Sequence, residues 1–442
     1  MSAHGDVHVP TRAELIPIAS KPLPKMLRTV SLVLAVAGFA LFAYGAATGH
    51  DRAWQAFQFN WMFFTTIASA AVTFAAVQRI TTARWSRSVV RFTEGFVAWL
   101  PVAFVLLVVT MFFGLDHIYP WATTAPHVPE KALWLSKGFL IPRDLFLFGL
   151  LTALSCWFVW NSVRLDVAIL PESGLAWAKG LRDRMRAGFG DERRELHTQH
   201  SLQGKIAVAL VILFGFGWVA LAWDLSMSAD VHFQSTMYGW QIFMGAWVVM
   251  LMILAIMLRL WRNYLGADEL IGESHYHDVG KLCFAFTAFW GYITFAQYLV
   301  IWYGNVPEET HFFNLRLSQP WMPLMTAGFV MMFVLPFFGL MGKYPKLFTP
   351  TMTLFALSSI IGLWIHRYLE IYPSIYGEVK SLPFGIWEIG IFAGFLGLWG
   401  FTYVGFMDAF PKMRVFMMTS QYRDEVQIPV DARTMEPLPA HE

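Results

Sequence analysis

GFVAWLPVAFVLLVVTMFFGLDHIYPWA, residues 95–122, is the stretch that first places this chain among membrane proteins. Its first 21 residues, 95–115, include no charged side chain. As a helix, a run of this length crosses the roughly 30 Å hydrocarbon core of a bilayer. Asp116 and His117 follow where the helix would leave the membrane. The stretch therefore predicts a membrane-spanning helix that ends in an acid and a titratable imidazole.

Comparable apolar runs recur along the whole chain. Of its 442 residues, 57% are hydrophobic and only 14% are charged, whereas soluble proteins carry about a quarter charged residues. We therefore expect an all-α polytopic membrane protein, and its net charge of +2 is too small to indicate nucleic-acid binding. The ten predicted spans are 29–48, 59–78, 95–115, 139–161, 204–223, 237–260, 282–303, 320–341, 347–368 and 384–407.

An even number of spans leaves both termini on one side of the membrane. Of the 32 Lys and Arg residues, 25 lie on that side. Loops rich in Lys and Arg stay in the cytoplasm, so we expect both termini to be cytoplasmic and the protein to be multi-pass.

The chain is expected to form a single integral domain, 29–407, between cytoplasmic tails at 1–28 and 408–442. The only sizeable loop, 162–203, is expected to form a short amphipathic helix and a charged turn on the cytoplasmic surface. Residues 1–28 are polar and mixed in charge, so we expect no secretory signal peptide.

A faint internal repeat divides the spans. FQFNWMFFTTIASAAV (57–72) and FQSTMYGWQIFMGAWV (233–248) each open a span that is followed by a hairpin. Two tandem four-helix units fit this pattern.

The sequence offers few Cys and His side chains that could ligate a redox cofactor. The two cysteines, Cys156 and Cys283, lie in separate apolar spans, whereas an iron–sulfur cluster takes about four thiolates. CxxCH, the motif of covalent c-type haem, does not occur. Of the 13 histidines, only His117 and His366 fall clearly within or at the edge of a span. We therefore expect no bound metal and no redox centre, with a quinone or quinol and lipids as the remaining candidate ligands.

Most ionisable residues of the spans gather near the predicted outer face. Charged groups within a membrane are costly and often mark functional sites. Four residues of one span, Ser359, Gly362, His366 and Glu370, share a helical face that leads outward. The candidate residues of this outer group are Asp116, His117, Arg143, Asp144, Asp224, His366, Arg367 and Glu388.

A smaller group lies toward the cytoplasmic side. Thr287, Gly291, Thr294 and Tyr298 share one face of a span, which would allow a path of hydroxyls and water between the two groups. The candidate residues for proton entry are Glu94, His277, Asp278, Lys281, Thr287 and Thr294.

Both groups also have a structural interpretation. Acids and arginines near span ends cap helices or pair at headgroup depth, and Ser and Thr allow membrane helices to pack closely. Asp278 and Lys281, three residues apart, fit an ion pair at the interface.

A functional interpretation comes from quinol chemistry. Oxidation of a quinol releases two electrons and two protons, so a base must lie near an apolar pocket that holds the ring. Imidazole suits that task because it titrates near neutral pH. An ion-coupled transporter would use the same residue types, so the residues alone leave both functions open.

Three stretches of the chain resemble a known family. HDVGKLCFAFTAFWGYITFAQYLVIWYGNVPEE (277–309) is similar to NrfD-like, polysulfide-reductase-type membrane subunits of bacterial alternative complex III, most of all the ActF-type subunit. DLSMSADVHFQSTMYGWQIFMG (224–245) and FGLDHIYPWA (113–122) resemble the same subunit. The similarity runs from about residue 55 to 405.

The resemblance implies a subunit of a quinol:cytochrome c or quinol:oxidase oxidoreductase in the bacterial inner membrane. It implies ten helices arranged as two four-helix bundles plus two flanking helices, without cofactors. It also implies a quinone-pocket pattern that pairs His117 with Asp144, and an acidic position at Asp224. The implied partners are a second NrfD-like subunit, an outer iron–sulfur subunit, multihaem c-type cytochromes and a terminal oxidase.

Three functions follow as expectations. The first is a subunit of a quinol-oxidising complex, in which the outer group forms a quinone pocket or the exit of a proton path. The second is a secondary transporter of a small solute, which would show broken helices in matching halves of the chain. The third is a purely structural membrane anchor.

Overall fold

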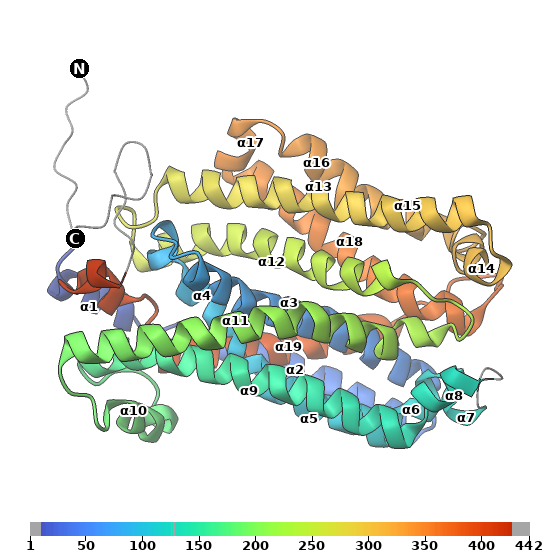
Figure 1. Ribbon diagram of the computed structural model, residues 1–442, viewed down its shortest axis with the longest axis horizontal. Coiled ribbons are helices and arrows are strands. Elements are labelled where there is room, and N and C mark those ends of the chain that lie inside the picture. Colours follow the sequence, from blue (N-terminus) through green and yellow to red (C-terminus); the bar gives the residue numbers. More distant parts are fainter. Residues whose placement is uncertain (1–9, 125, 127–128, 427–442) are drawn as a thin grey trace.

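The computed structural model describes residues 10–124, 126 and 129–426, which form helices and no strand. Ten of these helices are long and apolar enough to cross a membrane (Figure 1), which confirms the expected all-α polytopic fold. The ten are α2 (Lys25–Ala47), α3 (Asp51–Ile80), the segment α4–α6 (Val90–Ile118), α9 (Lys137–Ile169), α11 (Glu192–Leu225), α12 (Thr236–Leu265), α13 (Glu273–Gly304), α15–α16 (Met322–Gly339), α18 (Thr349–Tyr376) and α19 (Ile386–Ala409).

Several helices run well beyond the predicted apolar segments. The helix α11 begins at Glu192 rather than 204, where Asp191 accepts a hydrogen bond from the Arg194 N–H and caps the helix. Polar residues continue a helix outside the hydrocarbon, so hydropathy alone places its ends too close together. The predicted loop 162–203 consequently shrinks to 170–191, which includes the short helix α10 (Lys179–Arg186).

Two of the ten spans are irregular. The third is built from α4 (Val90–Glu94), η2 (Gly95–Ala98), α5 (Trp99–Val109), a π-helical turn η3 (Thr110–Gly114) and α6 (Leu115–Ile118). The eighth is built from α15 (Met322–Phe329), a π-helical turn η6 (Val330–Val334) and α16 (Leu335–Gly339). Such turns rotate the side chains that follow them, so η3 sets the direction of Asp116 and His117.

The helix α3 is the centre of the molecule, with 94% of its apolar segment buried. Its polar side chains accept hydrogen bonds from neighbouring helices. Trp364 Nε1 of α18 donates to Asn60 Oδ1 (2.9 Å), and Trp99 Nε1 of α5 donates to Thr65 Oγ1 (3.1 Å). These bonds fix the rotation of α3 against helices from both halves of the chain.

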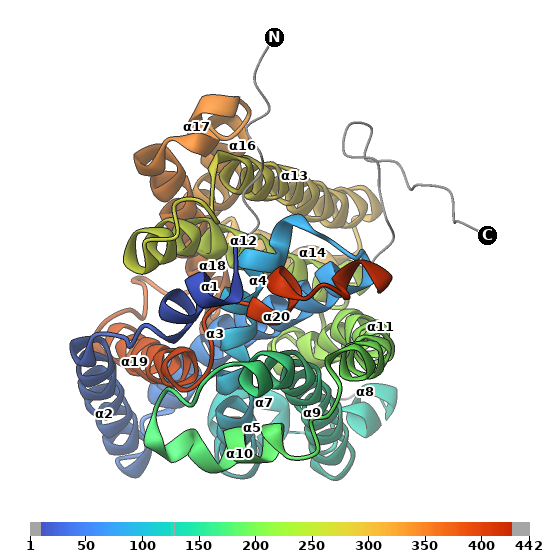
Figure 2. The same cartoon turned by 90° about the vertical axis from the view of Figure 1, so that its left-hand side faces the viewer.

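Eight of the ten spans form two groups of four helices (Figure 2). The first consists of α3, α5, α9 and α11, and the second of α12, α13, α15–α16 and α18. The helices α3 and α12, which contain the two halves of the faint repeat, are the most buried spans of their groups. They pack against each other and join the two groups.

The helices α2 and α19 form the flanking pair and pack along each other. A glycine seam of Gly38, Gly390, Gly394 and Gly397 runs between them. A Cβ atom at Gly38 would lie 2.2 Å from the Cα of Gly394, and one at Gly397 would lie 2.4 Å from the backbone nitrogen of Ala35. This backbone-to-backbone approach is possible only because the side chains are hydrogen atoms.

The end of the molecule that carries both chain termini is closed by two short helices, α1 (Arg12–Ser20) and α20 (Val415–Thr419). Leu15 and Ala19 of α1 pack with Val415, and the Lys412 N–H donates to the Ala19 carbonyl (3.0 Å). The segments predicted as tails therefore pack onto the bundle over their described parts, 10–28 and 408–426. Other short elements near this end are η1 (Trp85–Ser88), η4 (Ala176–Ala178), α17 (Lys343–Leu347) and η7 (Arg423–Glu425).

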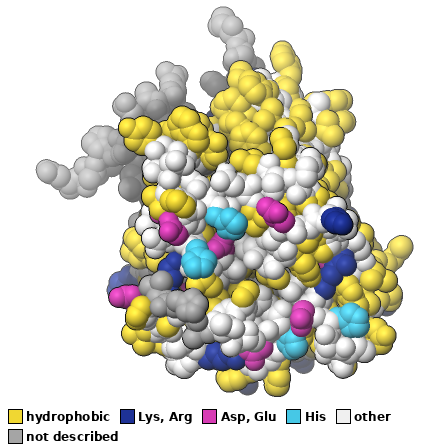
Figure 3. Space-filling model, turned by 90° about the vertical axis from the view of Figure 1, so that its right-hand side faces the viewer, with side chains coloured by type: hydrophobic (Ala, Val, Ile, Leu, Met, Phe, Trp, Pro, Cys, Tyr) yellow, Lys and Arg dark blue, Asp and Glu magenta, His cyan; other side chains and the backbone are white. Residues whose placement is uncertain are grey.

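The opposite end is covered by short helices between the spans. These are α7 (Pro120–Thr123), α8 (Pro129–Trp134), η5 (Met227–Ala229) and α14 (Pro307–Arg316). Acidic, basic and histidine side chains are scattered over this face in Figure 3, without a large patch of one sign. Most of the residues predicted for the outer group lie near this end, which we call the outer end.

Replacing Gly38 with Val is expected to separate α2 from α19. The valine side chain overlaps the α19 backbone, and overpacking of this kind costs about 1–3 kcal/mol. The melting temperature of the purified protein in detergent should fall. Gly215→Val is the control, because a Cβ atom there meets nothing within 4 Å. Equal melting temperatures for the two variants would contradict a tight seam.

Candidate functional site

Two buried carboxyl groups and one guanidinium form the core of the candidate site at the outer end. Asp144 of α9 and Asp224 of α11 are 0% and 1% exposed. Arg143 lies between them, with Nη2 2.8 Å from Asp224 Oδ2 and Nε 3.6 Å from Asp144 Oδ1. Three residues that the sequence predicted from two different spans are thus brought together, and the acids outnumber the base.

Trp134 of α8 joins this acid pair to a cavity. Its indole N–H donates to Asp224 Oδ1 (2.7 Å), and its ring lies 3.9 Å from the Arg143 guanidinium. The cavity has a volume of about 350 Å³ and a mostly apolar lining. Its walls are formed by Glu130, Lys131, Trp134, Leu135, Trp223, Met227, Ser228, Asp230, Val231 and Phe233.

One basic side chain lines the rim of this cavity. Lys131 Nζ donates to the Val231 carbonyl at 2.6 Å. Partial burial lowers the pKa of Lys131, partly offset by Asp230. The cavity size is within the range of small-molecule pockets, which is about 300–1,000 Å³. Aromatic walls with a few polar groups suit a flat ring with polar edges.

Asp116 and His117 lie outside this site. His117 Nδ1 is 2.6 Å from Asp51 Oδ1, and its ring stacks on Trp54 of α3. Asp116 pairs with Lys137 at the surface. The predicted pair of His117 and Asp144 forms no hydrogen bond or ion pair, although the structure describes both side chains. The π-helical turn before Asp116 accounts for this, since it turns the imidazole toward α3.

Glu388 is held by four hydrogen bonds. Arg52 of α3 donates to both of its carboxylate oxygens (2.7 Å each), Tyr372 donates to Oε1 (2.7 Å) and the Gly385 N–H donates to Oε2 (2.7 Å). The carboxylate thereby caps α19 and ties it to α3 and α18. These contacts are those of a structural latch, and a proton-transfer role for Glu388 stays a prediction.

His366, Arg367 and Glu370 lie on α18 within the second group of helices. The His366 ring packs edge-on against Trp290 of α13, at 5.2 Å between ring centres. Arg367 pairs with Glu370 (2.7 Å) and donates to the Ile242 carbonyl of α12 (2.7 Å). The residues of the predicted outer group therefore lie in several separate clusters. Only Arg143, Asp144 and Asp224 belong to one ion-pair cluster.

Glu94, predicted for proton entry, belongs to a buried cluster near the termini. Its carboxylate lies 2.5 Å from Arg91 and accepts a hydrogen bond from Ser162 Oγ (2.7 Å). Arg91 also pairs with Asp166, which accepts from the Phe416 N–H (2.8 Å). The cluster fastens α20 to α4 and α9.

The other inner candidates are spread along α13. Asp278 and Lys281 form an ion pair at 2.8 Å, as the structural interpretation expected, and His277 lies beside them in the sequence. Thr287 is fully buried, and Thr294 accepts from Gln241 Nε2 (3.2 Å). Tyr298, expected on the same face, is 38% exposed. Of the residues of this stripe, only Thr294 forms a hydrogen bond with a neighbouring helix.

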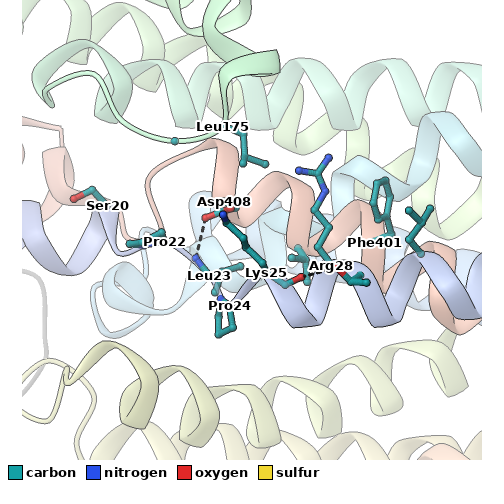
Figure 4. A pocket seen from close by; sticks show the side chains of 13 residues that line it. Ser20, Pro22, Leu23, Pro24, Lys25, Arg28, Leu175, Phe401 and Asp408 are labelled. Carbon is teal, nitrogen blue, oxygen red and sulfur yellow. Dashed lines mark hydrogen bonds between the residues drawn. The ribbon is translucent and has the colours of Figure 1, made fainter.

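A larger groove of about 610 Å³ opens at the end that carries the termini (Figure 4). It lies between the start of α2, the end of α19 and the loop that contains Leu175. Lys25 and Arg28 project along it, with the Arg28 guanidinium over the Phe401 ring at 5.1 Å. None of the predicted candidates lines this groove.

Sequence reasoning missed several partners of the site. Arg52 lies in the ten residues between the first two predicted spans, and Trp134 lies between the third and fourth, so neither fell within an apolar run. A basic cluster of Arg79, Arg87 and Arg414 was also missed, because Arg414 is far along the chain from the other two. Among the described residues, no group of three His, Cys, Asp or Glu side chains is placed to hold a metal ion.

Replacing Glu388 with Gln tests the latch. Loss of the charge leaves Arg52 without its carboxylate, and removing one partner of a buried ion pair costs about 3–5 kcal/mol. Because the Arg52 side chain is 28% exposed, we expect a smaller loss of about 2 kcal/mol, seen as a lower melting temperature.

Arg52→Gln is the matched control for the latch and should cost a similar amount. The double variant should cost little more than either single variant. A normal melting temperature together with reduced quinol-dependent electron transfer would instead favour the proton-transfer role.

No protein-family model matches this chain, and no curated protein matches it.

Proposed function

We propose that this chain is a membrane subunit of a quinol-oxidising respiratory complex, and that Asp144 and Asp224 accept the protons of the quinol. The observation that carries the proposal is a buried acid pair that shares one arginine beside an apolar, aromatic-lined cavity. The resemblance of residues 277–309, 224–245 and 113–122 to NrfD-like subunits of alternative complex III supports the same function.

The chemistry assigns a task to each part of the site. A quinol ring occupies the cavity between Trp134, Trp223 and Phe233, with its tail toward the lipid. As its two electrons leave to an iron–sulfur partner on the outer surface, its hydroxyl protons pass to the carboxyl groups. Arg143 lies beside both acids. Its positive charge stabilises each carboxylate once that carboxylate has passed its proton on.

Trp134 is well placed to connect the ring to the acids. Its ring forms a wall of the cavity, and its N–H is bonded to Asp224. Movement of this side chain would let a hydroxyl replace the indole N–H as the hydrogen-bond donor to Asp224. The exposed His117–Asp51 pair at the same end then serves as a relay to water.

The transporter alternative receives less support. A transporter of this kind would have broken helices at matching places in its two halves. The irregular spans are the second helix of the first group and the third helix of the second group. These positions do not correspond, so the transporter alternative lacks this supporting feature.

Purification of the native particle tests the partners. With a tag on the C-terminus and a mild detergent, we expect an iron–sulfur protein, c-type cytochromes and a second NrfD-like subunit to co-purify with this chain. A chain that elutes alone or as a homo-oligomer would contradict the respiratory function.

Asp224→Asn and Asp144→Asn test the acid pair. Each removes one proton acceptor and preserves the size of the side chain. Since general acid–base groups contribute about 10²–10⁴-fold, quinol-dependent reduction of cytochrome c should fall about 100-fold per assembled complex. Asp268→Asn, which breaks an exposed ion pair with Arg262, is the control. Full activity of both site variants would rule out this role.

A further inference from the structure

A cluster of arginines at the end that carries the termini is not used by the proposed function. Arg79 ends α3, Arg87 lies in η1, and Arg414 follows α19. All three line one narrow cavity together with Gln78, His200 and Gln203. The volume open to the centre of a water molecule is about 30 Å³. The cavity therefore admits a small polar group and excludes a ring.

The cluster carries more positive charge than its surroundings balance. Among the described residues, no carboxylate forms an ion pair with Arg79 or Arg87. Arg79 donates instead to the carbonyl oxygen and to Nδ1 (2.7 Å) of His200. That ring nitrogen must carry a lone pair to accept the bond, so His200 is neutral here and does not balance the charge of Arg79.

The acids near the cluster already face other arginines. Glu94 and Asp166 both face Arg91, and their field also reaches Arg414. Asp424, whose field reaches Arg87, lies 3.9 Å from Arg423. These three carboxylates balance Arg91, Arg414 and Arg423, which leaves the positive charges of Arg79 and Arg87 in excess.

Arg87 has unused donors as well as unbalanced charge. Its Nε and Nη2 atoms are buried and have no hydrogen-bond partner among the described residues. Burial, followed by repulsion from Arg423, lowers the pKa of Arg87 to about 10. Leaving buried N–H donors of a partly buried cation without acceptors is costly, so an anion that accepts from them would be stabilised here.

We propose that Arg79, Arg87 and Arg414 form a binding site for a phosphate group. The planar fork of a guanidinium matches two oxygens of a phosphate, and the excess positive charge attracts its negative charge. Basic pockets between membrane helices on the cytoplasmic side take anionic lipid headgroups, and inorganic phosphate offers the same chemistry. The site is independent of quinol oxidation.

Lysines and arginines of the groove in Figure 4 differ from this cluster. Lys25 is exposed, and Arg28 reaches the open groove, so water solvates these charges. Arg28→Gln is therefore the matched control for Arg87→Gln, since it removes the same charge at the same end of the molecule.

Thermal unfolding of the full-length protein, purified and delipidated in neutral detergent, tests the site. Dihexanoyl phosphatidylglycerol and inorganic phosphate are titrated separately, with chloride at matched ionic strength. We expect a rise in melting temperature that saturates. Arg87→Gln should weaken the apparent affinity at least tenfold, whereas Arg28→Gln should leave it unchanged.

Each outcome of the titration has a definite meaning. Saturation with the lipid alone assigns a headgroup, and saturation with both probes assigns the phosphate group in general. Without any probe, Arg87→Gln should melt no lower than the natural chain, because it removes an uncompensated charge. No saturable effect of either probe, or equal losses for Arg28→Gln and Arg87→Gln, would overturn the proposal.

Discussion

The complete burial of one helix is the constraint on which the rest of the structure depends. The helix α3 touches both groups of four helices and α19, so lipid reaches almost none of it. Its polar side chains need partners inside the protein, since an unsatisfied polar group in a dry interior is costly. Trp364 is the hydrogen-bond partner of Asn60, and Trp99 is that of Thr65. Gln58 donates to the Leu225 carbonyl. These bonds specify rotation and depth, which apolar contacts among membrane helices specify poorly.

The two ends of α3 lead to different kinds of chemistry. At the outer end, Asp51 contacts His117, and Arg52 forms an ion pair with Glu388. Gln58 and Tyr119 both donate hydrogen bonds to the carbonyl of Leu225, the residue next to Asp224. At the other end, Arg79 opens onto the cavity that we assign to a phosphate group. One continuous helix therefore extends from the acid-rich cluster at one end of the molecule to the arginine cluster at the other.

The sequence predicted all ten spans, because each apolar run is long enough to cross a bilayer and helices are the simplest way to satisfy the backbone there. It also placed Arg143, Asp144 and Asp224 at one end, since two hairpins deliver them to similar depth. It did not predict that Asp51 would bond His117 in place of Asp144, because that depends on a π-helical turn. Nor did it predict the Arg52 latch or the arginine cluster, whose members meet only through the packing of distant segments. Gly390 and Gly394 of α19 form a GxxxG pattern, but nothing in that pattern indicates which helix packs against it.

The glycine seam has a consequence for how the protein is made. Of the ten spans described, α2 is synthesised before the others, whereas α19, the helix against which it packs most extensively, begins about 340 residues after α2 ends. During synthesis the small-residue face of α2 stays exposed to lipid while the eight spans between them insert. The hydrogen bond from the Lys412 N–H to the Ala19 carbonyl forms only after that. The seam between α2 and α19 is therefore among the last contacts of the bundle to form.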